Sequence, residues 1–418
     1  MTELLHANKD RLWQTLMASA EIGRHGAGLR RLALSDDDKT MRDLFVSWAK
    51  AGGYGVTVDG IGNIFVRREG LDPTLPPVVM GSHLDTQVEG GRFDGILGVL
   101  SGLEVLRALD DAGVATLRPI EVVNWTDEEG ARFSTSMVGS FAFTGRFPLN
   151  HVLGLTDAHG ITVGAELDRI GYRGAAPVGG RKLDAYLELH IEQGPELDET
   201  GRDIGLITGS FHVRGFRVRF DGETAHVGPT PMDRRRNSLA AAGYMIAAVN
   251  DIGLAHASAG AKTTCARMSV WPNLYGIVPS RVELSVDFRH PEAAGVERMR
   301  MELEAALASA AEKARVSVET VASWTFGDFP FDPDLSERMR VLGPQISNAC
   351  VEMKSQAGHD AYALAEVTPT VMIFTPCKGG ITHNTAEDID LDRTMPGVDL
   401  LLNLVRDRAD RPKGAVHG

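Results

Sequence analysis

Two short apolar runs with a helical segment between them constrain the fold of this chain more than any other feature. PVVMGS (77–82) and PIEVVNW (119–125) each fit a buried strand. Between them, apolar residues recur at the spacing of one helix face: Ile96, Val99, Leu100, Leu103 and Leu106. A strand, a helix and a strand in this order are typical of a parallel sheet covered by helices. AYLELHI (185–191) and TPTVMIF (368–374) are predicted to add strands in the same style.

A different pattern begins near residue 210. FRVRF (216–220) and RVELSVDFR (281–289) alternate apolar and charged residues, as antiparallel strands with one wet face do. A helix is predicted at about 237–250 and another at about 294–314. Because 418 residues exceed one typical core, we expect two domains. The prediction is an α/β catalytic domain with a mostly parallel central sheet, formed by 1–210 and 331–418, and an inserted α+β domain at 211–330.

Charge and composition exclude several classes of function. The net charge of −13, without a basic run, argues against nucleic-acid binding. No apolar stretch reads as a membrane span, and the first residues lack a signal-peptide core, so we expect a cytoplasmic protein without a membrane partner. The three cysteines are far apart and predict reduced thiols rather than disulfides or a zinc knuckle.

Acids and imidazoles follow the predicted strands of the first pattern. In an open parallel sheet, ligands gather beyond the carboxyl ends of the strands. The side chains predicted at that edge are His83, Asp85, Asp94, Glu128, Glu129, His190 and His383. A single histidine there would more often be structural, and Glu128-Glu129 alone would read as a solvated acidic turn. Gathered carboxylates, however, repel one another unless a cation neutralises them.

The ligand types indicate which cation the edge would hold. Imidazole and carboxylate without thiolate favour zinc, with manganese, cobalt or nickel as alternatives. The number of candidate ligands predicts two divalent ions that share a bridging carboxylate.

Several motifs, in this order, resemble one family over nearly the whole chain. They are HLDT, GGRFDGILGVLSGLEVL, DEEGARF, LHIEQGP, AHVGPTPM and THNTAED. The chain resembles the M20 metallopeptidase superfamily, and within it the amidase/hydantoinase/carbamoylase branch. The resemblance implies a metal-dependent exopeptidase-like catalytic domain, two divalent metal ions and an inserted domain that serves as lid and dimerisation surface. It also implies a homodimer.

The resemblance assigns roles around the metals. His83 and His190 would bind one ion, Glu129 and His383 the other, and Asp94 would bridge them. Asp85 would orient the His83 ring. Glu128 would stay free of metal and act as the general base.

Roles in substrate recognition are also implied by the resemblance. His226, in the inserted domain, would stabilise the tetrahedral intermediate, in its own site or in the partner subunit's site; the alternative is a turn residue. Gln193 would hold the polar head of the substrate. Arg289 would pair with the substrate carboxylate, the alternative being an exposed strand arginine. His359 would lie near the reacting carbonyl or be structural. Gly276 stands where carbamoylases of this family carry an asparagine that helps bind the carboxylate.

The implied reaction is hydrolysis of a linear, non-peptide C–N bond in a small ureido or amide substrate. N-carbamoyl amino acids, or N-carbamoyl-β-alanine, are the expected substrates, giving amino acid, carbon dioxide and ammonia. Allantoate and N-acyl amino acids are alternatives. Gly276 changes the recognition site, so a bulkier or differently shaped amide is also compatible with the sequence. A non-catalytic binding protein on the same fold is the alternative of another class.

Overall fold

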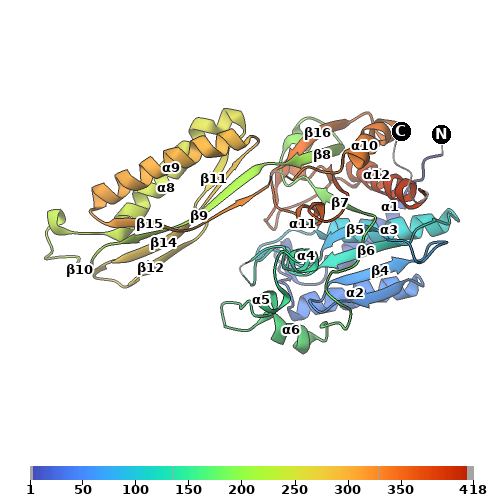
Figure 1. The fold of residues 1–418 in the computed structure, drawn as a ribbon, viewed down its shortest axis with the longest axis horizontal. Helices are drawn as coiled ribbons and strands as arrows, with labels where there is room; N and C mark the ends of the chain where they lie inside the picture. Colours follow the sequence, from blue (N-terminus) through green and yellow to red (C-terminus); the bar gives the residue numbers. More distant parts are fainter. Residues whose placement is uncertain (1–2, 134, 328, 412–418) are drawn as a thin grey trace. The chain divides into compact units, whose positions relative to one another are not determined.

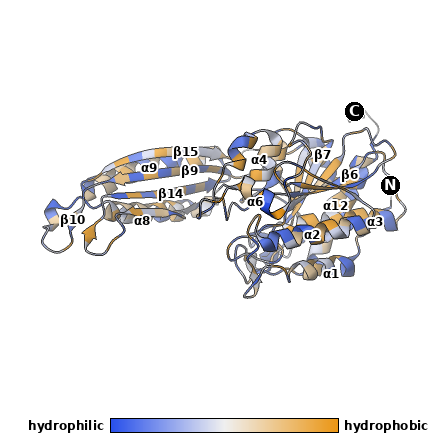
Figure 2. Ribbon diagram, turned by 90° about the horizontal axis from the view of Figure 1, so that it is seen from below, coloured by the Kyte–Doolittle hydropathy of each residue, from blue (hydrophilic) through white to orange (hydrophobic). Residues whose placement is uncertain are grey.

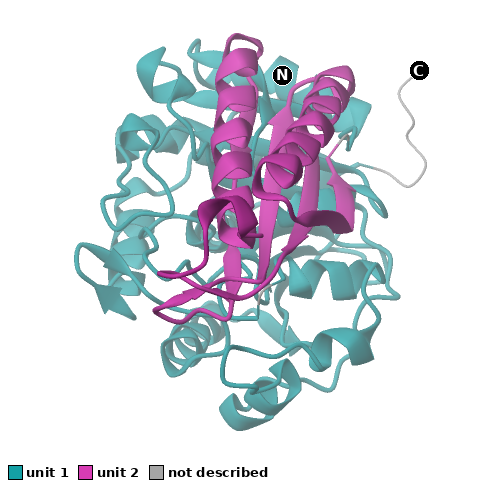
Figure 3. Ribbon diagram, turned by 90° about the vertical axis from the view of Figure 1, so that its left-hand side faces the viewer, with its two compact units in different colours: residues 1–209, 329–418 teal, residues 210–328 magenta. Residues whose placement is uncertain are grey.

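The computed structural model describes residues 3–133, 135–327 and 329–411 (Figure 1). The chain forms two compact units. The first comprises Met1–Gly209 and Phe329–Gly418, and the second Ser210–Asp328 (Figure 3). The role of the second unit as a lid or dimerisation domain stays a prediction.

A large mixed sheet forms the centre of the first unit. Its strands, in spatial order, are β16 (Cys350–Ser355), β8 (Ile204–Ser210), β17 (Thr370–Thr375), β7 (Ala185–Ile191), β5 (Val78–His83), β6 (Ile120–Trp125), β4 (Ile64–Arg68) and β3 (Gly55–Val58). The central neighbours β17, β7, β5 and β6 run parallel. The pairing is antiparallel where β4 meets β3 and β6, and where β8 meets β17. The predicted α/β class with a mostly parallel sheet is confirmed.

Helices cover both faces of this sheet. On one face, α3 (Ile96–Asp111) and α12 (Leu391–Ala409) pack closely on β7, because a Cβ at Gly98 would meet the carbonyl oxygen of Leu189 and a Cβ at Gly397 would meet its side chain. Glu188, on the opposite face, accepts the backbone N–H of Ala361 in α11 (Asp360–Ala365). The other helices of the unit are α1 (Lys9–Ser19), α2 (Asp36–Ala51), α4 (Val138–Thr144), α5 (Leu149–Leu153), α6 (Val163–Ile170), α7 (Glu196–Glu199) and α10 (Pro333–Ile346).

Helix α2 illustrates how the sequence builds these covering helices. Ser35 caps it, since its side chain accepts the backbone N–H of Asp38. Met41, Phe45 and Ala49, four residues apart, are fully buried. Figure 2 accordingly shows both hydrophilic and hydrophobic residues along α2. The short elements of this unit are β1 (Arg24–His25), β2 (Gly28–Leu29) and the 3₁₀ turn Lys378–Gly380.

The second unit is an antiparallel sheet with helices packed on it. Its long strands are β9 (His212–Asp221), β14 (Arg281–His290) and β15 (Ser317–Phe326), with β11 (Lys262–Thr264) and β12 (Met268–Trp271) on β14. Its helices are α8 (Ser238–His256) and α9 (Ala293–Ala314), with 3₁₀ turns at Met232–Arg234 and Ala257–Ala259. β10 (Ala225–His226) and β13 (Ile277–Val278) form a separate ribbon. The predicted antiparallel strands and both predicted helices are confirmed.

Helix α8, with its 3₁₀ extension, is long and apolar enough by composition to cross a membrane. By length and composition it is an exception to the expectation that no apolar stretch reads as a membrane span. In the structure Ala241, Met245, Val249 and Ile252 belong to the core of the second unit, together with Val286 of β14. One face of the helix therefore packs against the sheet, and 33% of the apolar window is buried.

Candidate functional site

The site lies where the parallel strands of the first unit end. His83 is the last residue of β5 and His190 is the penultimate residue of β7. Glu128 follows β6 after a tight turn in which Asp127 has a positive φ of 55°. Since the strands are parallel and neighbouring, their ends meet at one sheet edge. Strand register thus brings the ends of β5, β6 and β7 together, whereas Asp94 and His383 come from segments outside the strands.

The approach to Asp94 depends on a glycine. Gly95, which precedes α3, has a φ of 69°, and a Cβ there would lie 2.2 Å from the His83 ring. Only glycine leaves room for the imidazole and adopts this backbone without strain. Gly95 therefore allows the His83 ring to lie close to the Asp94 carboxylate.

Two groups of potential ligands share Asp94. His83, Asp94 and His190 offer ligand atoms that lie within 4.8 Å of one another, and so do Asp94, Glu129 and His383. Asp94 Oδ1 is 3.2 Å from His190 Nε2, and Asp94 Oδ2 is 3.4 Å from His383 Nε2. His383 Nε2 is also 3.3 Å from Glu129 Oε2. One carboxylate between two such groups is the arrangement that a pair of divalent ions requires.

The histidine rings are held so that Nε2 faces the cluster. His83 Nδ1 is 2.9 Å from the carbonyl oxygen of Asp85, and His190 Nδ1 is 2.9 Å from that of Ile191. A carbonyl only accepts, so Nδ1 carries the proton in each ring and Nε2 keeps its lone pair for a metal. His190 Nε2 and Asp94 Oδ1 are buried without a hydrogen-bond partner among the described residues. Both atoms are therefore suited to bind a metal ion.

The electrostatics of the cluster also fit a cation. Burial raises the pKa values of Glu128 and Glu129 well above their ordinary range, and neighbouring carboxylates raise them further. Burial lowers the pKa of His83 to about 4, which favours the neutral, ligating imidazole. Burial alone would raise the pKa of Asp94, but His190, His383 and His83 hold it below its usual value. Divalent cations would offset the repulsion among these carboxylates.

Glu128 is placed differently from Glu129. Its Oε2 lies 3.5 Å from His83 Nε2, yet it belongs to neither group that could hold an ion. It is 8% exposed, so the carboxylate is buried at the edge of the cluster. A carboxylate that is close to metal ligands and free of the metal can transfer protons.

Asp85 makes a different contact from the predicted one. Its Oδ1 is 4.0 Å from His83 Nδ1, which is too far for a hydrogen bond, and the ring is held by the Asp85 backbone carbonyl instead. The carboxylate turns the other way and accepts the backbone N–H groups of Glu128 and Glu129, each at 3.3 Å. Asp85 therefore positions the loop of the glutamates, which corrects the predicted orientation of the His83 ring by this carboxylate.

Three supporting residues were not predicted. Gln87 Nε2 donates to Glu129 Oε2 at 2.8 Å. Glu387 Oε1 accepts the backbone N–H of Phe93 at 2.9 Å and of Asp94 at 3.1 Å, which ties the His383 segment to the Asp94 turn. Glu188 Oε1 accepts a hydrogen bond from Ser82 Oγ at 2.8 Å, and Glu188 and His190 offer ligand atoms within 4.8 Å of each other. The only sequence signal for Glu387 was its place four residues after His383 in THNTAED.

Gln193 and His359, both predicted to meet substrate, lie against the ligands. Gln193 Nε2 donates to Asp94 Oδ2 at 2.8 Å, from a backbone with a φ of 60°. The His359 ring lies 4.4 Å from that of His190, edge to face, and forms a third possible ligand group with Glu188 and His190. Their roles towards substrate stay predictions.

The other predicted recognition residues belong to the second unit, which is described by itself. His226 is exposed on the β10–β13 ribbon, and its Nδ1 accepts the backbone N–H of Gly228 at 3.0 Å. Arg289 is on β14, with Nε donating to Asp287 Oδ1 at 2.8 Å. Gly276 has a φ of 87°, and a Cβ there would meet no atom within 4 Å. These placements leave the predicted roles untested.

Comparisons with known proteins bear on this site. Residues 79–407 match the model of the peptidase family M20/M25/M40. An N-carbamoyl-L-amino-acid amidohydrolase from Rhizobium meliloti is 41% identical over 404 residues, 96% of this chain and 97% of that protein. The solved structure of an amidase of the hydantoinase/carbamoylase family from Burkholderia vietnamiensis is 45% identical, with a TM-score of 0.91 over 98% of this chain and 99% of that one. An allantoate amidohydrolase from Bacillus subtilis is 29% identical, covering 84% of this chain and 86% of that protein.

Proposed function

The chain belongs to the peptidase family M20/M25/M40, and we propose that it is a metal-dependent amidohydrolase that cleaves N-carbamoyl amino acids. The observation that carries this proposal is the pair of ligand groups sharing Asp94, with Glu128 beside them. The 41% identity to the Rhizobium enzyme over nearly both full lengths supports the substrate class. Because every predicted ligand and Glu128 are retained, a non-catalytic binding protein is not favoured.

The residues present fit two divalent ions. His83 and His190 would hold one, Glu129 and His383 the other, and Asp94 would contact both. We propose zinc, with manganese, cobalt or nickel as alternatives, because the ligands are imidazoles and carboxylates without thiolate. When bound, the ions would polarise the carbonyl of the ureido group and lower the pKa of the attacking water.

The protein side chains supply the remaining chemistry. Glu128 would take a proton from the attacking water and deliver it to the leaving nitrogen, a task that suits a buried carboxylate with a raised pKa. His226 would donate a hydrogen bond to the oxyanion, and Arg289 would pair with the substrate carboxylate. Release of the carbamate leads to the amino acid, carbon dioxide and ammonia.

Allantoate is the second candidate substrate. The similarity to the Bacillus enzyme supports it. Purified, metal-loaded protein should be assayed with N-carbamoyl-L-amino acids, N-carbamoyl-β-alanine, allantoate and an N-acetyl amino acid. The highest kcat/KM for an N-carbamoyl amino acid would support the proposal, and turnover of none of the ureido compounds would overturn it.

We further propose a cytoplasmic homodimer. The described cysteines are free thiols, which suits a reducing compartment. Helix α8 of the second unit exposes Tyr244 and Leu254, an apolar surface that a second copy could cover. Light scattering of the purified protein would give the mass; a monomer at micromolar concentration would contradict the dimer.

A further inference from the structure

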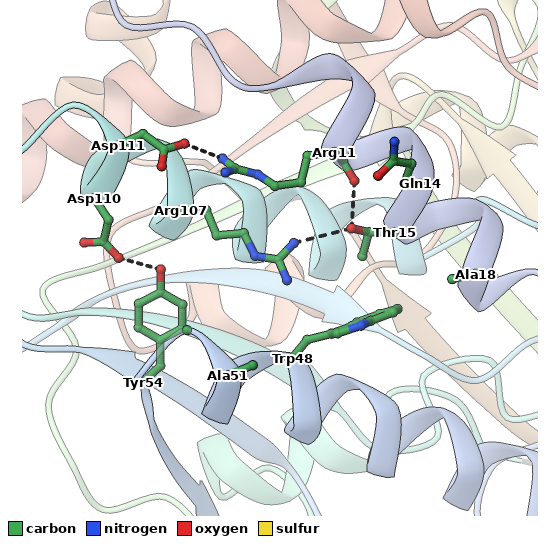
Figure 4. Close-up of a pocket in the computed structure, with 11 residues that line it drawn as sticks. Arg11, Gln14, Thr15, Ala18, Trp48, Ala51, Tyr54, Arg107, Asp110 and Asp111 are labelled. Carbon is green, nitrogen blue, oxygen red and sulfur yellow. Dashed lines mark hydrogen bonds and ion pairs between the residues drawn. The ribbon is translucent and has the colours of Figure 1, made fainter.

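A second site is suggested by a pocket in the first unit (Figure 4). Its volume is about 540 Å³, and it lies among α1 and the C-terminal ends of α2 and α3. The metal cluster is at the other end of α3, because Asp94 precedes that helix while Arg107 lies in its last turns. Arg107 lies eleven positions after Ile96 in the helix, a rise of about 16.5 Å. The pocket is thus distinct from the candidate metal centre.

Most charges around the pocket are neutralised within the protein. Arg11 donates to both oxygens of the buried Glu104 carboxylate at 2.7 Å and also pairs with Asp111 at 2.8 Å. Asp110 accepts from the Tyr54 hydroxyl at 2.6 Å and from Arg68 at 2.7 Å. These charged groups are already paired within the protein and need no ligand to neutralise them.

Arg107 is the exception. Among the described residues its guanidinium has no carboxylate within ion-pair distance, and its one hydrogen bond goes to Thr15 Oγ1 at 3.4 Å. The side chain is half-buried, and burial lowers its pKa although Glu104 partly offsets that effect. Figure 4 shows the guanidinium directed into the space between Thr15 and Trp48. A half-buried cation with one long hydrogen bond still has donors to offer an anion.

The rest of the lining defines what kind of anion fits. Gln14 and Thr15 supply polar groups beside the cation, whereas Trp48, Ala18 and Ala51 supply apolar surface. We propose that the pocket binds a small monocarboxylate with a flat apolar body. Arg107 takes the carboxylate and the indole of Trp48 contacts the body.

The pocket offers one arginine without a carboxylate partner among the described residues, which selects against more highly charged ligands. Asp110 and Asp111 line the same space as Arg107. A dianion such as phosphate would bring a second charge that Arg107 alone does not neutralise, because Arg11 is already paired, and it would gain nothing from Trp48. A neutral aromatic molecule would contact Trp48 but leave the guanidinium without its anion. The preferred ligand therefore needs both one negative charge and an apolar body.

The test titrates the metal-loaded full chain with phenylacetate, inorganic phosphate and 2-phenylethanol. Binding is followed by tryptophan fluorescence and by equilibrium dialysis. Phenylacetate should bind saturably in the millimolar range, and at least about tenfold more tightly than either comparison compound. Arg107→Gln should weaken phenylacetate binding at least about tenfold.

Two control variants separate the pocket from other sites. Arg173→Gln, which removes an exposed arginine paired with Asp168, should leave phenylacetate affinity unchanged. Trp48→Phe should abolish the fluorescence change while dialysis still detects binding. The proposal is overturned if phenylacetate does not saturate, if Arg107→Gln binds it as tightly as the parent, or if phosphate binds equally well. Hydrolase activity enters none of these readouts, so failure here leaves the proposed function unaffected.

Discussion

Asp85 holds Glu128 by its backbone: the Asp85 carboxylate accepts the N–H of Glu128 through Oδ1, and that of Glu129 through Oδ2, each at 3.3 Å. One buried side chain thus fixes the strand end that carries both the proposed base and a proposed ligand. The backbone carbonyl of the same residue accepts a hydrogen bond from Nδ1–H of His83. Asp85 links two strand ends of the cluster through different atoms.

Asp85→Asn tests this link. The amide keeps one acceptor but turns an N–H₂ group towards a backbone N–H, so the loop loses a contact. We expect kcat or metal affinity to fall about 10- to 100-fold, as for other residues that support metal ligands. The His83 contact should survive, because it uses the backbone. Asp392→Asn, at an exposed position, serves as the control; equal activity of both variants would argue against the positioning role.

Glu128 and Glu129 offer a matched pair, because the same change at adjacent residues should have different consequences. Glu128→Gln should retain both metals and lose about 10²- to 10⁴-fold in kcat, since it removes a proton carrier. Glu129→Gln should bind less metal, since Glu129 Oε2 lies in the group with Asp94 and His383. Metal content by elemental analysis, measured with kcat, distinguishes them. Metal loss in Glu128→Gln would contradict its assignment as the base.

Glu387 is expected to position Asp94. Glu387 Oε1 accepts both backbone N–H groups, so Glu387→Gln can keep these contacts and should change metal affinity little. Glu387→Ala removes the contacts. We expect Glu387→Ala to weaken metal affinity about 10- to 100-fold. Gly91→Ala should behave similarly, because its Cβ would lie 1.9 Å from Glu387 Cδ. Metal affinity is measured by competition with a chelator, and equal affinities of the Gln and Ala variants would contradict this role.

The sequence predicted the fold and the edge where the cluster lies, because strands and their ends are encoded in local patterns. PVVMGS and AYLELHI predicted β5 and β7, and their ends carry His83 and His190. It did not predict Gln87 or Glu387, because their partners are distant in the chain and depend on how loops pack. It also misassigned the atom of Asp85 that holds His83, since a motif indicates proximity but not which way a carboxylate turns.

In the metal-free protein, the contribution of Asp85 and Glu387 to stability should fall as pH rises. Burial raises the pKa of Asp85 to about 7 and that of Glu387 to about 8, against about 4 when unfolded. A carboxyl group with a raised folded pKa favours the folded state fully below the unfolded value, and this contribution is lost as pH rises through the folded value. This contribution to stability is therefore lost between about pH 4 and pH 8.

Bound cations should counter this loss, because they favour the ionised carboxylates of the cluster. The Tm difference between metal-loaded and chelated protein should widen between pH 5 and pH 8, by on the order of 5 °C. Differential scanning calorimetry at several pH values measures it. A difference that is constant, or that narrows with pH, would contradict the electrostatic account of the cluster.

Gly276→Asn tests whether the missing side chain sets substrate preference. The backbone φ of 87° is one that asparagine tolerates better than most residues, and its Cβ would meet no atom within 4 Å, so the variant should fold. If the position faces the substrate carboxylate, KM for N-carbamoyl-L-amino acids should fall about tenfold, the effect of one hydrogen bond to a charged group. kcat should change little, because the metal ligands are untouched. Gly276→Ala adds the Cβ without the amide and controls for backbone strain. An equal drop in KM in both variants, or no drop in either, would show that the asparagine amide does not determine substrate preference.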